Sequence, residues 1–283
     1  MRPMSSLTGK IGCSVKTMEN RSPVCPVLTF TAGIIILFLA LSSALLFAQE
    51  IWVPPQRTSW QWQLNGRVNQ SYDVDMYDID LFETDPSVVL SLHDQGKRVI
   101  CYFSAGSLEQ WRPDASAFPP SVIGKPLAGW PGERWLDIRK IDIVGPIMAA
   151  RLDLCREKGF DGVETDNIEG YTNDTGFPLT YEDQLKYNAF LAHEAHARGL
   201  SIGLKNDLDQ IPDLVHLFDW ALNEQCFQFD ECHKLMPFIE AGKAVFHVEY
   251  KLPAKRFCSA ANELNFNSLK KRRSLKAWRK ACR

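Results

Sequence analysis

Hydrophobic and polar positions between residues 50 and 283 follow two alternating periods. Short runs rich in β-branched and aromatic residues predict strands, and they alternate with stretches whose apolar positions recur at helical spacing. Eight runs predict strands: WQWQL at 60, MYDIDLF at 76, RVICYFS at 98, DGVETD at 161, SIGLKN at 201, DWALNE at 219, AVFHVEY at 244 and NFNSL at 265. Five stretches predict helices: 85–95, 142–158, 181–198, 231–241 and 254–263.

Several of the predicted helices end at a glycine just before the next strand: Gly96, Gly159, Gly199 and Gly242. Strand and helix alternation predicts parallel pairing with helices on the sheet faces. Eight such units predict an α/β fold, a (β/α)8 TIM barrel over residues 52–283. An open doubly wound sheet is the alternative, but no G-x-G-x-x-G follows the first strand. The long loop at 104–137 carries three tryptophans, and long loops inside compact domains are usually functional.

The N-terminal segment carries an export signal. Residues 27–49 hold no charged residue and are long enough to cross a bilayer as a helix. Four basic residues and one acidic residue precede this run, which predicts a cytosolic segment at 1–26 and an extracellular domain after the run. We expect a transmembrane signal anchor, that is, a single-pass type II membrane protein. A cleaved signal peptide, giving a secreted protein, is the alternative, and a buried core helix is a third interpretation.

Cysteine usage agrees with export, because six of the eight cysteines follow the apolar run. We predict disulfides between Cys226 and Cys232, which flank a short turn, and between Cys258 and Cys282 at the C-terminus. Cys101 and Cys155 fall in a strand and a helix pattern, and we expect both to be buried free thiols. The exported cysteines include no C-x-x-C pair, so no metal site is expected.

Two sequons, at Asn69 and Asn173, fit a glycoprotein, although such sequons often arise by chance.

The formal net charge of −2 hides an uneven distribution. Residues 270–283 hold eight basic residues and no acid, whereas residues 27–269 hold 20 basic and 33 acidic residues. An acidic body favours a cationic ligand through long-range steering. We expect the basic tail to be a solvated helix and not to bind nucleic acid, because no partner motif accompanies it. We expect a monomer.

The stretch GFDGVETDNIEG at residues 159–170 places carboxylates at the end of a strand that is otherwise apolar enough to be buried. Strand alternation puts Gly162, Glu164 and Asp166 on one face. Asp166 is the last residue before the loop, which in an α/β barrel is the rim where catalytic residues collect. Other predicted strands also end in polar side chains: Asp80, Tyr102, Lys205, Asn206, Glu224, Glu249 and Tyr250.

The residue inventory restricts the chemistry that this rim can perform. The sequence has no G-x-S-x-G nucleophile elbow, no histidine pair at metal-ligand spacing and no glycine-rich phosphate loop after a strand. Carboxylates with aromatic and amide neighbours remain. Two carboxylates across a groove, with aromatic rings to stack on sugars, can cleave a glycosidic bond. No cofactor is expected.

At these residues the sequence resembles glycoside hydrolase family 114, the endo-α-1,4-polygalactosaminidases. The stretches that carry the resemblance are CYFSAGSLEQWRPD, GERWLDIR, GFDGVETDN, YTNDTGFPLT, ARGLSIGLKND, LNEQCFQFDEC and AGKAVFHVEY, and they lie between about Trp60 and Cys282. The resemblance implies a (β/α)8 barrel and, as substrate, a partly deacetylated polysaccharide that contains galactosamine. Such a cationic polymer would suit the acidic body. Thr165 stands where the family often has proline.

The two acids of the family correspond to Asp166 in ETDN and Glu224 in NEQC. We expect Asp166 to be the nucleophile and Glu224 the acid/base of a retaining mechanism, by analogy with other α-retaining barrels, although the two roles could be exchanged. We expect the substrate to contact Asp80, Tyr102, Asp137, Asn167, Lys205, Asn206 and Glu249. Two alternatives are an α-galactosidase-like hydrolase of neutral sugars and a non-catalytic carbohydrate-binding protein.

Overall fold

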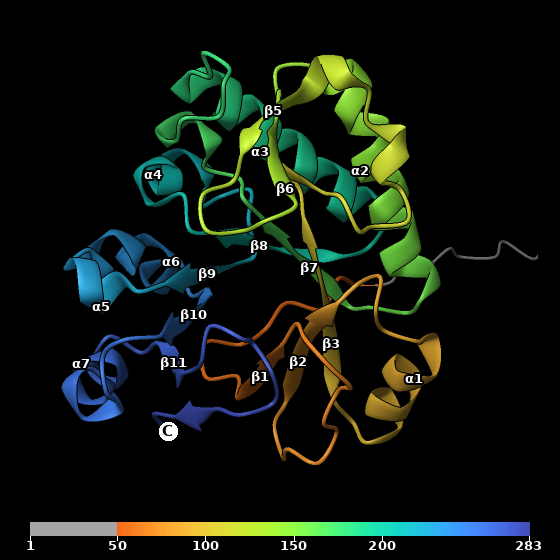
Figure 1. Ribbon diagram of the computed structural model, residues 1–283. Helices are drawn as coiled ribbons and strands as arrows, with labels where there is room; N and C mark the ends of the chain where they lie inside the picture. The colour runs from red at the N-terminus through yellow and green to blue at the C-terminus, as the bar shows by residue number, and fades with distance from the viewer. Residues whose placement is uncertain (1–49) are drawn as a thin grey trace, which may run out of the picture. The chain divides into compact units, whose positions relative to one another are not determined.

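The computed structural model describes residues 50–283, and one curled sheet organises them (Figure 1). Eight strands run parallel in chain order: β1 (Trp60–Gln63), β2 (Met76–Asp80), β3 (Arg98–Ser104), β7 (Gly162–Asp166), β8 (Ser201–Lys205), β9 (Trp220–Glu224), β10 (Ala244–Glu249) and β11 (Asn267–Lys270). The two-residue strand β12 (Lys280–Ala281) pairs antiparallel with β11. The eight predicted strands and their parallel order are therefore confirmed.

Side chains close the predicted barrel at its seam, the place where β1 meets the C-terminal segment. The sheet of the described chain runs from β1 to β12, and side-chain contacts bridge β1 to the C-terminal segment. Trp60 Nε1 donates to Asn267 O at 2.8 Å, and Lys271 Nζ donates to Trp62 O at 2.5 Å. Arg279 donates to Trp60 O at 2.9 Å. The fold is thus an α/β barrel-like curled sheet of nine strands.

The predicted helices are present on the outer face of the sheet (Figure 1). Their bounds are α1 (Pro86–Asp94), α2 (Ile141–Glu157), α3 (Tyr181–Ala197), α6 (Met236–Glu240) and α7 (Cys258–Glu263). The last two are shorter than predicted because a 3-10 turn precedes each, at Cys232–Leu235 and Ala254–Arg256. Two short helices were not predicted: α4 (Ile211–Leu214) and α5 (Cys226–Phe229).

The long segment at 104–137 folds into a second sheet of three antiparallel strands. These are β4 (Ser107–Glu109), β5 (Ile123–Pro126) and β6 (Glu133–Leu136), in the order β4-β6-β5. It follows β3, the strand that pairs with β7. Gly106 begins this segment, and a Cβ on it would lie 1.7 Å from Asn167 O, so only glycine allows the two loops to approach.

Apolar side chains form two cores. One lies inside the curled sheet and includes Trp60, Trp62, Trp220 and Phe246. The indole of Trp220 fills space left by Gly203 on the neighbouring strand, since a Cβ there would lie 2.2 Å from its ring. The larger core packs the outer faces of the strands against the helices. The bottom of the barrel is therefore solid, and polar groups gather at the other end.

Three disulfides join the six cysteines of residues 50–283. Cys226–Cys232 and Cys258–Cys282 pair as predicted. The expectation that Cys101 and Cys155 are free thiols is wrong, because these residues form the third disulfide. Cys101 on β3 points toward the outer core, and Cys155 on α2 lies in the same core. Strand alternation alone does not show which helix residue Cys101 contacts.

The C-terminal tail is not the predicted helix. It runs across the seam as a loop and β12, held by the buried ammonium of Lys271 and by the backbone bond from Leu64 N to Leu275 O. The predicted cytosolic segment and transmembrane anchor lie outside the described residues. Within residues 50–283, none of the helices is both long and apolar enough to span a membrane.

Candidate active site

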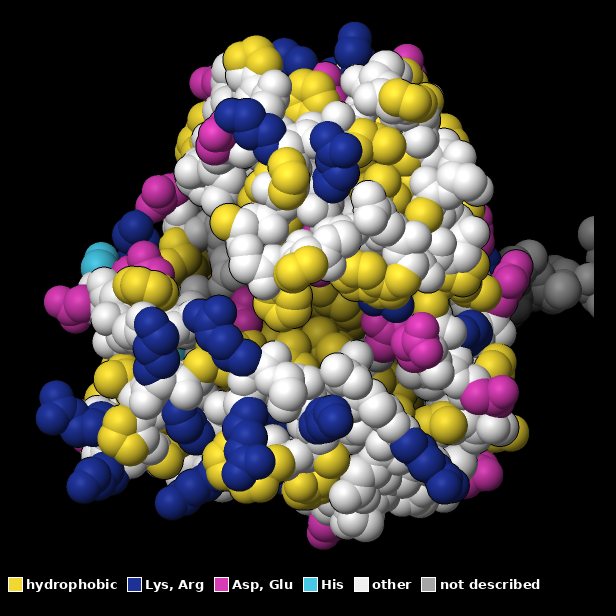
Figure 2. Space-filling view, in the orientation of Figure 1, with side chains coloured by type: hydrophobic (Ala, Val, Ile, Leu, Met, Phe, Trp, Pro, Cys, Tyr) yellow, Lys and Arg dark blue, Asp and Glu magenta, His cyan; other side chains and the backbone are white. Residues whose placement is uncertain are grey.

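A cavity of about 950 Å³ opens at the carboxyl ends of the parallel strands. Figure 2 shows the hollow from outside, with an apolar floor and charged side chains at its edges. Catalytic sites of α/β barrels lie at this end of the strands. Its lining includes Asp80, Tyr102, Asp166, Asn167, Lys205, Asn206 and Glu224. Seven of the nine predicted site residues therefore meet in one pocket.

Asp166 and Glu224 approach one another around a single ammonium group. Lys205 Nζ lies 3.0 Å from Asp166 Oδ1 and 3.5 Å from Glu224 Oε2, which bounds the separation of these two oxygens at 6.5 Å. Lys205 is buried, and burial alone would lower its pKa. The surrounding carboxylates outweigh burial and raise the pKa of Lys205 well above its ordinary value, so the ammonium stays charged.

Each of the two acids also accepts a phenol hydrogen bond. Tyr102 donates to Asp166 Oδ2 at 3.0 Å, and Tyr250 donates to Glu224 Oε1. Asp166 Oδ1 accepts a further bond from the backbone N–H of Asn167 at 2.9 Å. Asp166 thereby accepts hydrogen bonds on both of its carboxylate oxygens. The hydroxyl of Tyr250 can donate to a carboxylate or accept from a carboxylic acid, so its contact suits either state of Glu224.

The residues that follow the strand ends turn the chain sharply. Asn167 and Gln225, which follow the two acids, have φ values of 60° and 68°, and Asn206 after Lys205 has a φ of 51°. Asparagine adopts this left-handed conformation more readily than most residues with a side chain. Asn206 Oδ1 accepts from the backbone N–H of Glu224 at 3.0 Å. The two predicted asparagines thus position the acids as well as lining the cavity.

A fully buried polar layer supports the acids from below. Glu164, on the same strand face as Asp166, accepts from Lys205 Nζ at 2.7 Å and from Trp62 Nε1 at 2.9 Å. Below it, burial and the neighbouring Glu164 raise the pKa of Asp78 well above its usual range. Neither oxygen of Asp78 has a donor in the described chain, which fits a neutral carboxyl group that donates to Glu164.

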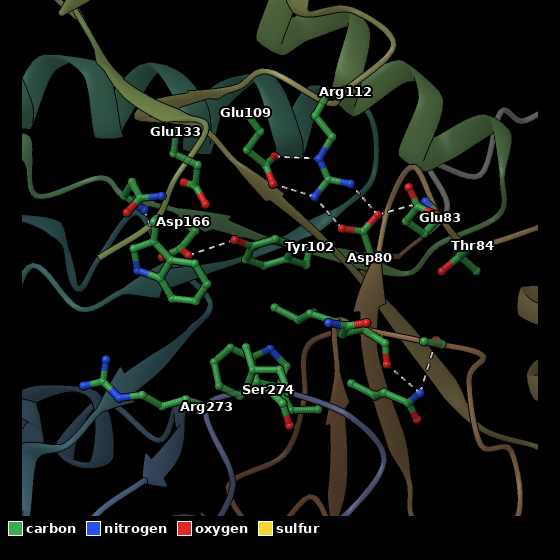
Figure 3. A pocket seen from close by; sticks show the side chains of 18 of the residues that line it. Asp80, Glu83, Thr84, Tyr102, Glu109, Arg112, Glu133, Asp166, Arg273 and Ser274 are labelled. Atoms are coloured by element: carbon green, nitrogen blue, oxygen red, sulfur yellow. Dashed lines mark hydrogen bonds and ion pairs between the residues drawn. The ribbon is translucent and has the colours of Figure 1, made fainter. Parts of the chain in front are cut away.

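One wall of the cavity is acidic (Figure 3). Arg112 makes two-pronged ion pairs with both Asp80 and Glu109, at 2.6 to 2.9 Å, and all three side chains are buried. Asp80 also accepts from the backbone N–H groups of Phe82 and Glu83, so it shapes the loop after β2. Glu133, beside this cluster, also lines the cavity.

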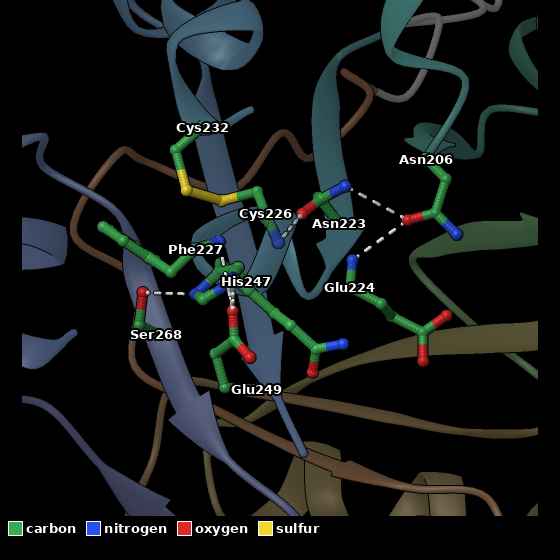
Figure 4. Close-up of a disulfide and its surroundings, with 10 residues drawn as sticks. Asn206, Asn223, Glu224, Cys226, Phe227, Cys232, His247, Glu249 and Ser268 are labelled. Carbon is green, nitrogen blue, oxygen red and sulfur yellow. Dashed lines mark hydrogen bonds and ion pairs between the residues drawn. A yellow bond between two sulfur atoms is a disulfide. The ribbon is translucent and has the colours of Figure 1, made fainter. Parts of the chain in front are cut away.

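Two of the predicted substrate contacts do not line the cavity. Asp137 lies after β6 and binds Arg139, with the closest atoms 2.7 Å apart. Glu249 points away from the barrel interior and accepts from the backbone N–H groups of Phe227 and Gln228 at 3.1 Å, beside the Cys226–Cys232 disulfide (Figure 4). It caps the unsatisfied amides of α5, as carboxylates do at helix N-termini. Both residues have structural contacts in place of the predicted substrate contacts.

Several residues around the two acids were not predicted as part of the site. Tyr250, which contacts Glu224 Oε1, directly follows β10, and alternation puts only one of Glu249 and Tyr250 on the inner face. Glu133 begins β6 of the second sheet and Glu169 lies in the loop after β7, and both line the cavity. Burial raises the pKa of Glu169 to about 8, and its Oε2 has no partner in the described chain. Neither glutamate follows a predicted barrel strand directly, so no pattern marked it.

This arrangement of two facing acids at the mouth of an α/β barrel defines a glycoside hydrolase. The sequence model of glycoside-hydrolase family GH114 matches residues 42–283, and the chain belongs to this family. The resemblance found in the sequence is confirmed. A comparison with curated protein sequences gave no match.

Solved structures agree with the family. The chain is similar to Aspergillus fumigatus Ega3 in complex with galactosamine, with 43% identity, 82% of this chain and 98% of that chain covered, and a TM-score of 0.78. The glycoside hydrolase domain of Pseudomonas aeruginosa PelA shares the fold at 13% identity, with coverage of 81% and 99% and a TM-score of 0.63. The Thermus thermophilus α-galactosidase TtGalA shares it at 13% identity, with coverage of 79% and 62% and a TM-score of 0.53.

Proposed function

We propose that this glycoside hydrolase cleaves α-1,4-linked polysaccharide that contains galactosamine, and that it attacks within the chain. The observation that carries the proposal is the pair Asp166 and Glu224, held around Lys205 in a pocket with an acidic wall. A deacetylated amino sugar is a cation, and the acidic pocket favours it. Ega3, to which the chain is 43% identical, is described in complex with galactosamine, which supports the same class of sugar here.

An endo-acting mode is supported by the rim of the cavity. Trp111 and Trp130 from the 104–137 segment line it and expose about half of their surface, 53% and 48% respectively. Aromatic rings in this position can stack on the apolar faces of sugar units on either side of the bond that is cut. A hydrolase of single neutral α-galactosides has no need of an acidic wall, and this alternative is not favoured.

In the proposed mechanism Asp166 attacks the anomeric carbon while Glu224 protonates the leaving oxygen. The donors around Asp166 hold its carboxylate in place for attack, as a nucleophile requires. Glu224 then acts as base on a water molecule that releases the sugar from Asp166. The separation of at most 6.5 Å between the nearest oxygens of the pair supports retention, because inverting enzymes need about 6.5 to 9.5 Å between the carboxyl groups.

Three disulfides fit an extracellular protein. We propose that the apolar run at 27–49 directs export and keeps the domain on the outer face of the membrane as a type II anchor. If it does, activity stays with the membranes after a carbonate wash. A soluble product that begins near Gln49 would instead show cleavage and secretion.

The test of function is digestion of defined polymers by the purified exported domain. Galactosamine polymer should be cut to oligomers, and a chromogenic neutral α-galactoside should not be cut. Asp166→Asn and Glu224→Gln should each remove nearly all turnover, because both keep the side-chain size and remove the ionisable carboxyl group. Binding of the polymer without any cleavage by the wild type would favour the non-catalytic alternative.

A further inference from the structure

Glu133 is a buried carboxylate that faces the cavity without a cationic partner. It begins β6, and its side chain points into the pocket beside Asp166 (Figure 3). Its exposed fraction is only 6%. Ser107 Oγ donates to Oε2 at 2.9 Å, and Oε1 has no hydrogen bond within residues 50–283. Oε1 is open to the cavity, so a group bound there can reach a carboxylate that is otherwise largely buried.

The neighbours of Glu133 explain why the protein itself does not neutralise it. Glu109 stands directly opposite on β4, and Arg112 from the following loop is already committed to Glu109 and Asp80. From β7, Asp166 adds a further negative charge. Burial, followed by the charges of Glu109 and Asp166 and opposed by Ser107 and Arg112, raises the pKa of Glu133 to about 7. A cation placed against Oε1 would restore its ionised form.

We propose that Glu133 is a specificity-determining residue that receives the ammonium group of a sugar unit bound next to the scissile bond, and so selects deacetylated over N-acetylated galactosamine. This inference rests on the proposed function. An ammonium group has three N–H donors and a full positive charge, so it can both donate a hydrogen bond to Oε1 and neutralise the buried carboxylate. An N-acetyl group at the same place brings a neutral amide and extra volume, and it leaves the carboxylate unpaired.

The matched substitution is Glu133→Gln, which keeps the size and the contact with Ser107 and removes the charge. On fully deacetylated galactosamine oligomers we expect a rise in KM of about 10- to 100-fold with a much smaller change in kcat. On partly N-acetylated oligomers of the same length, the change should be small. Glu240→Gln serves as the control, since it removes one negative charge at an exposed site on α6 and should alter neither constant.

The pH dependence gives a second readout that a structural role would not produce. Since free Glu133 has a pKa of about 7, the KM of the wild type for deacetylated oligomers should rise as the pH falls through about 7. In the Glu133→Gln variant, this rise in KM at low pH should be absent. An equal fall in kcat on both substrates with unchanged KM would overturn the inference, as would wild-type selectivity in the variant. If the wild type itself cleaves neither substrate, the proposed function fails instead.

Discussion

Lys205 and Asp166 form an ion pair across two neighbouring parallel strands, with Nζ 3.0 Å from Oδ1. The same ammonium contacts Glu164 at 2.7 Å and lies 3.5 Å from Glu224. One buried cation therefore fixes the positions of three carboxylates that would otherwise repel each other. Because all three of its ion-pair partners are carboxylates, Lys205 sets the electrostatics of the acids as well as lining the pocket.

Replacement of Lys205 by methionine should remove this control while keeping the length of the side chain. We expect kcat to fall at least about 100-fold, because the acids lose both their placement and their counter-charge. The acidic limb of the kcat/KM profile should move to higher pH, since the positive charge that favours ionised carboxylates is gone. Circular dichroism controls for folding. An unchanged profile in a folded variant would show that Lys205 does not tune the acids.

Tyr250→Phe tests the partner of Glu224. The hydroxyl of Tyr250 contacts Glu224 Oε1, and loss of this single bond leaves the ring in place. We expect kcat to fall by about 10-fold or more with little change in the unfolding temperature. A substrate with a good leaving group should suffer less, because it needs less help from the acid. Equal losses on good and poor leaving groups would argue against Glu224 as the proton donor.

Asp207 should make the stability of the domain pH-dependent. It is buried in a left-handed conformation, and burial raises its pKa to about 8, although Asn188 donates to it at 2.8 Å. With a folded-state pKa above the unfolded value of about 4, its stabilising contribution is complete below pH 4 and is lost as the pH rises through 8. Asp207→Asn should therefore become progressively more stable than the wild type between about pH 5 and pH 8 in urea unfolding. A constant difference would refute the assignment.

The Cys101–Cys155 disulfide closes the longest loop of the three, with a sequence separation of 54. On chain entropy such a cross-link stabilises the fold by about 4 kcal/mol, more than the short Cys226–Cys232 bridge at about 2 kcal/mol. Replacing both Cys101 and Cys155 by alanine should lower the free energy of unfolding more than replacing Cys226 and Cys232. Peptide mapping without reduction should recover all three cross-linked pairs. Recovery of Cys101 as a free thiol would contradict the structure.

The sequence predicted the strand order and the position of Asp166 and Glu224 at strand ends, because both depend on local patterns. Strand–helix alternation is visible in hydrophobic periods, and Asp166 and Glu224 each end an apolar run. The closure of the barrel was less predictable. It depends on Lys271 and Arg279 reaching back to β1 from the basic tail, and nothing in the tail composition distinguishes a buried lysine from a solvated one.

The lining of the pocket was less predictable for a similar reason. Asp80, Tyr102 and Lys205 line it as predicted, since each lies at the end of a strand with its side chain on the inner face. Glu249 also ends a strand, but it lies one position out of phase with Tyr250 and points outward. Glu133 comes from the 104–137 segment, where only the folded second sheet shows that β6 faces the catalytic acids.

The stereochemistry of the first product tests the central claim most directly. Proton NMR of a freshly started digest of α-1,4-linked galactosamine polymer should show the α-anomer first, with the β-anomer appearing later by mutarotation. This result is expected if Asp166 forms a covalent intermediate and Glu224 activates the water. Release of the β-anomer first would contradict this account, and it would point to a water-activating carboxylate such as Glu169, a further acid of the pocket.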